Sequence, residues 1–226
     1  MYYIKKLIYI GLFFCASKSI AQESFESLSE SAFSVNHKFS SVYKANFAIK
    51  SRAYIYQNDN LRYKQRQVDI VHFSTYSLNH NNSLSLGIQY RNRDLFEDKS
   101  NELRLTQQYN FTKKRLSKRF GHRFRVEQRF LEAVTVHRIR YRFALDFPLK
   151  GDQLDINEAY FISSMELLNS MNALSAPEID HRTTVQIGWL LSEKINLQAG
   201  LEYRFEAFNI ITEQKLFILT SAILKI

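Results

Sequence analysis

Arginines recur at every second position in two neighbouring stretches of this sequence. Residues 123–130 read RFRVEQRF and residues 138–147 read RIRYRFALDF, with apolar residues between the arginines. A guanidinium group is always charged and presents a planar fork of N–H donors, so it binds carboxylates, phosphates and other anions. Glu127 lies among these arginines. The residue types therefore predict ionic contacts and surroundings that favour anions.

Charged and apolar residues alternate in the same way elsewhere in the chain. A period of two is typical of a strand, whose successive side chains point to opposite faces, whereas a helix would scatter the pattern around its axis. We therefore predict that the charged residues line the interior of a barrel. The candidate lining residues are Arg91, Arg93, Arg104, Arg123, Arg125, Glu127, Arg129, Arg138, Arg140, Arg142, Glu158, Glu202, Arg204 and Glu206.

Other chemistry finds little support in the sequence. There is no G-x-S-x-G, H-x-x-x-H or H-E-x-x-H motif and no glycine-rich phosphate loop, and Cys15 is the only cysteine. We predict no catalytic residue, no metal site and no cofactor. An interfacial enzyme acting on lipid remains an alternative because several histidines are available, namely His37, His72, His80, His122, His137 and His181.

Eleven segments are candidate strands. Seven hold their alternation throughout: 43–55, 84–93, 102–111, 123–130, 138–147, 184–191 and 195–206. Four are weaker: 25–38, 66–78, 157–166 and 214–225, of which 66–78 changes phase between Ile70 and Val71, as a β-bulge would cause. A tilted strand of about 9–11 residues crosses a bilayer. The pattern predicts an all-β, antiparallel up-and-down transmembrane barrel of about 10–12 strands.

The connections between these segments alternate in length. Short ones are expected at 40–41, 80–82 and 192–194, and longer ones at 57–64, 94–100, 131–136, 167–182 and 207–213. Outer-membrane barrels have short periplasmic turns and longer outer loops. With eleven strands, the first would then start at the outer side. Either the count is wrong by one or the N-terminal strand is unusual.

Alternation alone does not say which face of the strands meets water. Three features favour a membrane barrel over a soluble one: the polar face combines Arg with Glu, strands recur about every 18–20 residues and not every 8–12 as in a sandwich, and aromatics lie towards strand ends. These aromatics are Tyr43, Tyr90, Tyr109, Phe147 and Tyr203. We predict a partly wet, electropositive interior. A soluble periplasmic β-barrel that binds a hydrophobic ligand remains an alternative.

The N-terminus has the features of a secretory signal. Lys5 and Lys6 precede a short apolar run, and Ser19-Ile20-Ala21 offers small residues for cleavage. We predict a signal peptide over 1–21 and a single barrel domain over 22–226, in the outer membrane of a Gram-negative bacterium. Removing the signal lowers the formal net charge from +9 to +6, because three lysines lie within it. Because the chain is expected to be exported, we predict no nucleic acid partner despite its basic charge.

Four segments together resemble a family of bacterial envelope proteins, Domain of Unknown Function 2490. They are RFRVEQRFLE (123–132), RIRYRFALDFPLKG (138–151), INEAYFISSMELLN (156–169) and DHRTTVQIGWLLSEKINLQAGLEYRF (180–205). The family pattern is matched by Glu127 with Arg129, by Arg138 to Arg142 with Pro148-Leu149, by Glu158 and Glu166, and by His181-Arg182 with Gly188. The chain departs from it near Phe33, where a tryptophan is expected, and at Ile226, which replaces a final aromatic residue.

This resemblance implies an outer-membrane-like β-barrel without an established activity. The expected partners are outer-membrane lipid and, during biogenesis, the barrel-assembly machinery, and the oligomeric state is left open. With the charged interior, the prediction is a structural role or the passage of small solutes, biased towards anions.

Overall fold

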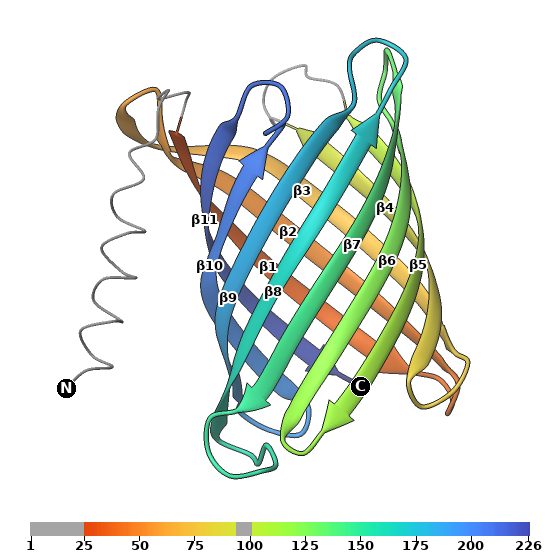
Figure 1. The fold of residues 1–226 in the computed structure, drawn as a ribbon. Helices are drawn as coiled ribbons and strands as arrows, with labels where there is room; N and C mark the ends of the chain where they lie inside the picture. Colours follow the sequence, from red (N-terminus) through yellow and green to blue (C-terminus); the bar gives the residue numbers. More distant parts are fainter. Residues whose placement is uncertain (1–24, 94–100) are drawn as a thin grey trace, which may run out of the picture.

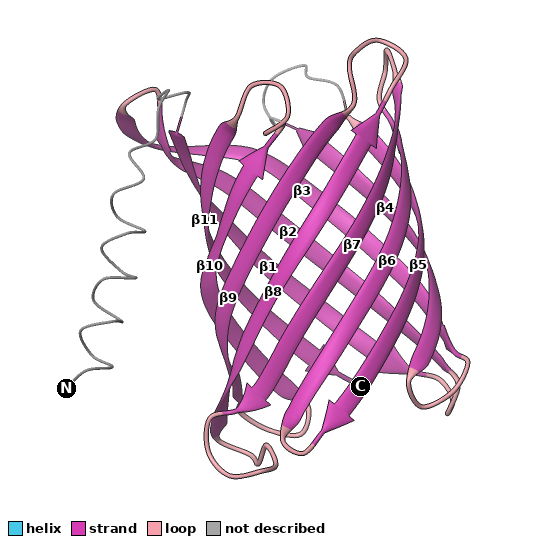
Figure 2. Ribbon diagram, viewed as in Figure 1, coloured by secondary structure: helices cyan, strands magenta, loops and turns pink. Residues whose placement is uncertain are grey.

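The computed structural model describes residues 25–93 and 101–226, which form one closed β-barrel (Figures 1 and 2). The predicted signal peptide lies outside the described residues. Within them, no helix is long and apolar enough to cross a membrane. The strands are β1 (Phe25–Lys38), β2 (Tyr43–Gln57), β3 (Asn60–Ser77), β4 (Asn82–Arg93), β5 (Glu102–Arg115), β6 (Lys118–Phe130), β7 (Thr135–Pro148), β8 (Glu158–Met171), β9 (Glu178–Leu190), β10 (Ile195–Glu206) and β11 (Glu213–Lys225).

Successive strands pair antiparallel around the barrel, and β1 closes it by pairing parallel with β11. That ladder runs from Phe25 opposite Gln214 to Asn36 opposite Lys225. A parallel closure is unavoidable here, because the first and last of eleven alternating strands point the same way. The predicted all-β, up-and-down barrel of 10–12 strands is therefore confirmed in strand number and topology, and the count of eleven was correct.

The odd strand number places the start of β1 and the C-terminus at opposite ends of the barrel (Figure 1). We call the end that carries the C-terminus the C-terminal rim. Its connections cover 39–42, 78–81, 116–117, 149–157 and 191–194. At the opposite rim, the prediction of a long connection over 57–64 is wrong. Asn58 and Asp59 form a two-residue turn there, both with left-handed φ angles of 52° and 61°, as a tight hairpin requires. The predicted connection at 167–182 is also shorter, since β8 continues to Met171 and β9 begins at Glu178.

Polar residues fill the barrel and apolar residues cover its outside. In β5, Glu102, Arg104 and Thr106 are buried, whereas the intervening Leu103 and Leu105 are exposed. The outward face is continuous from strand to strand. Directly paired exposed residues form a row across six strands, made of Phe33, Ile49, Ile70, Tyr90, Leu103 and Phe130. This distribution is the inverse of that in a soluble protein.

The prediction of a β-bulge between Ile70 and Val71 is wrong. The register between β3 and β4 is continuous through this point, and an irregularity between β2 and β3 lies instead at Arg66. The apparent phase change arises because Val71 and Phe73 are apolar residues on the inward face. The Phe73 ring covers Gly87, where a Cβ would lie only 2.3 Å from it. The missing side chain of the glycine therefore makes room for an aromatic ring inside the barrel.

A second aromatic ring is seated on a glycine in the same way. A Cβ at Gly188 would lie 2.2 Å from the ring of Tyr160. The Tyr160 hydroxyl donates to Asn196 Oδ1 at 2.9 Å and accepts from Gln198 Nε2 at 2.8 Å. These contacts tie β8 to β9 and β10 and fix the barrel wall near the C-terminal rim.

Candidate functional site

A fully buried carboxylate, Glu102, gathers four arginines from three strands. Its Oε1 lies 2.6 Å from Arg104 Nη2 and 2.8 Å from Arg129 Nε. Its Oε2 lies 2.8 Å from Arg93 Nη2 and 3.7 Å from Arg91 Nη1. Strand alternation brings these residues together, because all five occupy inward positions on β4, β5 and β6. One negative charge is thus shared by four positive ones.

A second buried carboxylate, Glu127, links this group to the next strands. Arg140 bridges two carboxylates, with Nη1 2.8 Å from Glu127 and Nη2 2.6 Å from Glu166. Arg104 Nη1 lies 3.6 Å from Glu127, and Arg123 Nη2 lies 3.2 Å from Glu166. Buried charges of this kind stabilise a fold only when they are paired with good geometry. The network therefore holds each guanidinium in a fixed place.

Arginines on the opposite wall are also held by carboxylates. Arg52 bonds Glu30, and Arg204 contacts Glu202 at 2.5 Å. Both guanidinium groups lie over the ring of Phe217, at 4.8 Å for Arg52 and 3.7 Å for Arg204. A cation over an aromatic face is attracted by the ring quadrupole. Phe217 therefore anchors charged groups from both sides of the β1–β11 seam.

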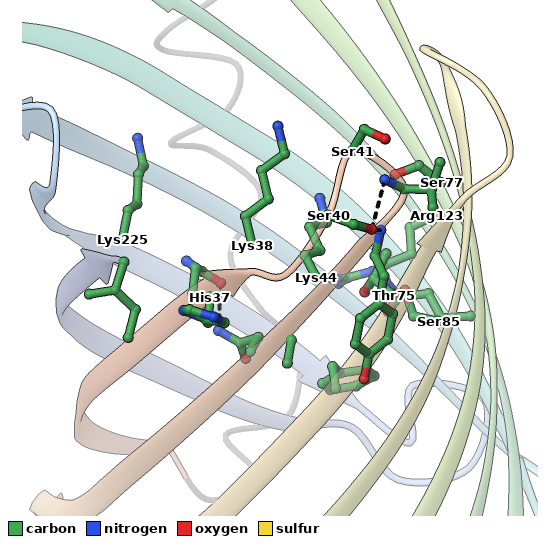
Figure 3. Close-up of a pocket in the computed structure, with 18 of the residues that line it drawn as sticks. His37, Lys38, Ser40, Ser41, Lys44, Thr75, Ser77, Ser85, Arg123 and Lys225 are labelled. Atoms are coloured by element: carbon green, nitrogen blue, oxygen red, sulfur yellow. Dashed lines mark hydrogen bonds between the residues drawn. The ribbon is translucent and has the colours of Figure 1, made fainter.

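Three cavities that share lining residues follow one another along the barrel interior. The first, of about 900 Å³, opens at the C-terminal rim, and we call it the vestibule (Figure 3). Its basic groups are Lys38, Lys44, Arg119, Arg123, Arg125 and Lys225, and no acidic side chain of the described residues lines it. Hydroxyl groups of Ser40, Ser77 and Ser85 add polar character. The vestibule is therefore an electropositive entrance.

The second cavity, of about 310 Å³, shares Arg123 and Arg125 with the vestibule, and we call it the middle chamber. Ten basic and four acidic side chains line it. Glu102, Glu127, Asp180 and Glu206 also contact some of these arginines and bring the acidic total to eight, so an excess of two positive charges remains among the described residues. The basic residues are Lys50, Arg52, Arg91, Arg104, Arg123, Arg125, Arg140, Arg142, Arg182 and Arg204, and the acidic ones are Glu30, Asp69, Glu166 and Glu202.

The third cavity, of about 390 Å³, lies towards the opposite rim. It shares Arg52, Arg91, Arg104, Arg182 and Arg204 with the middle chamber and adds four arginines and four carboxylates, namely Arg66, Arg93, Arg129, Arg138, Glu178, Asp180, Glu206 and Glu213. Among these, Glu206 receives Lys215 Nζ at 2.7 Å. Among the described residues, the vestibule therefore has no acidic side chain beside its basic ones, whereas each of the two inner cavities has four carboxylates in its lining.

Most of the predicted lining residues lie together in this interior. They line one of the three cavities or contact residues that do so: Arg91, Arg93, Arg104, Arg123, Arg125, Glu127, Arg129, Arg138, Arg140, Arg142, Glu202, Arg204 and Glu206. Glu158 lies apart from them, at the C-terminal rim, where its carboxylate is 3.8 Å from Lys150 Nζ.

Several interior charges were missing from the predicted set. They are Glu30, Lys50, Arg52, Asp69, Glu102, Glu166, Asp180, Arg182 and Lys215. The period-two alternation would have identified Glu102, because residues two apart on a strand share a face and Arg104 was in the predicted set. It would also have identified Lys50 and Arg52, which alternate with apolar residues in the same way. Glu30 and Asp69 lie on strands with weak alternation, so the sequence offers less signal for them.

Within the described strands, a serine–histidine pair on the outward face is relevant to the enzyme alternative. His72 Nε2 lies 3.1 Å from Ser74 Oγ on β3. The other ring nitrogen, Nδ1, is buried and has no hydrogen-bond partner within the described chain. A catalytic histidine needs a third group that orients its ring, so the pair does not form a triad. In the part of the chain that the structure covers, no group of three His, Cys, Asp or Glu residues could hold a metal ion.

Comparison with known proteins identifies a family but no activity. The family model described as "Protein of unknown function (DUF2490)" matches residues 31–213. No curated protein matches the chain. The match spans β2 to β10 entirely and most of β1, so it includes nearly all of the interior described above.

Proposed function

The chain belongs to the DUF2490 family, whose description gives no function, and we propose that it is an outer-membrane β-barrel that passes small anions through its interior. The observation that carries this proposal is the inverted distribution of residues, with ion pairs inside and apolar side chains outside. The match of the family model confirms the predicted family resemblance, and the activity is our inference from the geometry.

The outward surface supports insertion into a membrane. Apolar side chains such as Phe33, Ile49 and Ile70 are more than half exposed across neighbouring strands. A soluble monomer rarely exposes an apolar patch larger than a few hundred Å². The outward polar residues Gln107 and Gln128 bond each other at 3.2 Å. Polar groups in contact with hydrocarbon must bond one another in this way, because no water is present to accept or donate a hydrogen bond.

The lengths of the connections support a particular orientation, and exposed aromatic residues mark a membrane interface. Tyr43, Tyr76, Tyr109 and Trp189 are exposed on the outward face close to the C-terminal rim. Aromatic girdles lie at the membrane interfaces of such barrels, and short turns face the periplasm. Four of the five connections at this rim have four residues or fewer. We infer that the C-terminal rim faces the periplasm and that outer-membrane lipid and the assembly machinery are the partners.

The interior favours anions over the alternatives. A soluble barrel for a hydrophobic ligand needs an apolar cavity, whereas the middle chamber is lined mainly by charged groups. A vestibule rich in lysine and arginine concentrates anions at its mouth. The carboxylates among the arginines of the two inner cavities weaken the binding of an anion, so that it can leave again, as passage requires.

The test is the reversal potential of the purified protein in a planar bilayer with a KCl gradient. We expect the current to reverse at a potential of the sign set by chloride. Lys44→Glu in the vestibule should lower the chloride-to-potassium permeability ratio about two- to fivefold, because it replaces an attractive charge by a repulsive one. Lys150→Glu is the matched control, since Lys150 belongs to the same rim but lies outside the vestibule. A silent bilayer or a preference for potassium would contradict anion passage.

A further inference from the structure

We propose that the middle chamber is a binding site for a small multivalent oxyanion carrying phosphate or carboxylate groups. The proposal rests on the proposed function only for the route by which the anion reaches the chamber. It goes beyond that function because a solute would bind in the interior, whereas an open pore only conducts halide ions.

Unsatisfied donors gather at this one place. Within the described chain, four arginines have a buried Nε without a hydrogen-bond acceptor: Arg123, Arg140, Arg142 and Arg182. All four line the middle chamber. A buried donor without an acceptor is costly, and arginine Nε and Nη groups together form the fork that matches phosphate and carboxylate oxygens. Each of these Nε atoms is closed to solvent in the structure, so an oxyanion in the chamber would bond the guanidinium groups through Nη and would reach Nε only after the side chain turns.

The unpaired charge indicates a multivalent ligand. Arg142 lies opposite Glu166 in the β7–β8 ladder, but that carboxylate is already engaged by Arg123 and Arg140. Arg142 itself forms no ion pair with a carboxylate of the described residues. A halide ion would compensate one of the excess positive charges around the chamber, whereas pyrophosphate or citrate compensates more than one.

Several other arginines around the chamber are held in place before any ligand arrives. Asp69 binds Arg91 through two hydrogen bonds of 2.8 and 2.9 Å, and Glu202 holds Arg204. Arg140 is fixed by carboxylates on both sides. A ligand then binds without ordering these long side chains, which increases its affinity. The volume of about 310 Å³ is at the small end of ligand pockets and suits a compact anion.

Isothermal titration of the folded barrel in a non-ionic detergent tests the chamber directly. Pyrophosphate and citrate are the probes, which separate phosphate from carboxylate ligands, and chloride is the monovalent comparison. We expect saturable binding of pyrophosphate, citrate or both, and none of chloride at matched ionic strength. Arg142→Gln should weaken that binding roughly tenfold, as expected for the loss of a charge-assisted contact.

Lys150→Gln is the control for this experiment. Lys150 lines none of the three cavities, its side chain is 86% exposed, and its Nζ lies 3.8 Å from Glu158, so its loss should change the affinity by less than about twofold. Folding of each variant is checked by heat-modifiable migration on a gel. If the folded wild type binds neither probe saturably, or if both variants weaken binding equally, the proposal is overturned and the donors are satisfied by water only.

A bilayer recording separates this proposal from the proposed function. Chloride current without saturable binding of either probe rejects the chamber site and leaves anion passage standing. Saturable binding with a silent bilayer rejects passage and leaves the chamber as a binding site. If both stand, adding the bound probe should block the chloride current, and Arg142→Gln should relieve the block.

Discussion

Replacing Glu102 with alanine is expected to remove about 3–5 kcal/mol from the free energy of unfolding of the barrel. The Glu102 carboxylate is fully buried and contacts Arg91, Arg93, Arg104 and Arg129. Without it, these positive charges would repel one another inside the barrel wall. Urea unfolding of the protein in detergent micelles, followed by circular dichroism, measures the loss.

Glu213→Ala is the control for the Glu102 variant. Glu213 also forms an ion pair, with Lys215 at 2.6 Å, but its side chain is 49% exposed at the opposite rim. Solvent screens such a pair, so we expect a loss below about 1 kcal/mol. Adding Arg129→Gln to a Glu102→Gln variant should recover part of the loss, because it removes one uncompensated charge. Equal stability of Glu102→Ala and the wild type would show that the interior is too wet for the network to matter.

The second large effect concerns the outward face. Ile70→Arg should destabilise the barrel in lipid vesicles by about 2–4 kcal/mol, since an arginine near the bilayer midplane is costly. Ile70 is 59% exposed near the middle of β3, between Ile49 and Tyr90. The measurement is the denaturant midpoint of folding into vesicles, with wild type and variant compared under the same conditions.

Leu174→Arg is the matched substitution outside the apolar belt. Leu174 is 73% exposed in the connection between β8 and β9. If lipid surrounds the strands, this variant should behave like the wild type while Ile70→Arg loses stability. If both variants are tolerated equally, the outward face meets water and the membrane proposal fails.

Period-two alternation was the part of the sequence that predicted the fold best. It placed β10 at its observed bounds, 195–206, because Leu197, Ala199 and Leu201 alternate with polar residues without interruption. It failed on β3, where Phe73 is an apolar residue inside the barrel. An aromatic ring over a glycine is a contact between two strands, and alternation along one strand cannot reveal it.

The turns were predicted less well than the strands. A two-residue turn at Asn58 and Asp59 lacks the glycine that marks most tight hairpins, so the polar residues around it were assigned to a longer loop. The parallel closure of β1 with β11 follows from the strand count alone, but only once the weak segment 25–38 is accepted as a strand.

The sequence predicted which residues face the interior of the barrel, but not which of them form ion pairs with one another. Parity placed Arg140 and Glu127 on the inward side. Which carboxylate serves which arginine depends on strand register and barrel closure. The unengaged Arg142 is visible only when its neighbours' partners are known. A sequence therefore indicates that an interior is charged, whereas the structure is needed to locate the positive charges that no carboxylate compensates.

Quenching of the fluorescence of Trp189 in lipid vesicles tests the inside-out arrangement most directly. Trp189 is the only tryptophan, is 41% exposed, and lies on the outward face between Ala159 and Leu197. Because Trp189 lies close to the membrane interface, we expect strong quenching by phospholipids brominated on the acyl chain near the headgroup and weaker quenching by iodide in the buffer. Efficient quenching by iodide together with indifference to brominated lipid would contradict the account, because the apolar face of the strands would then be in contact with water.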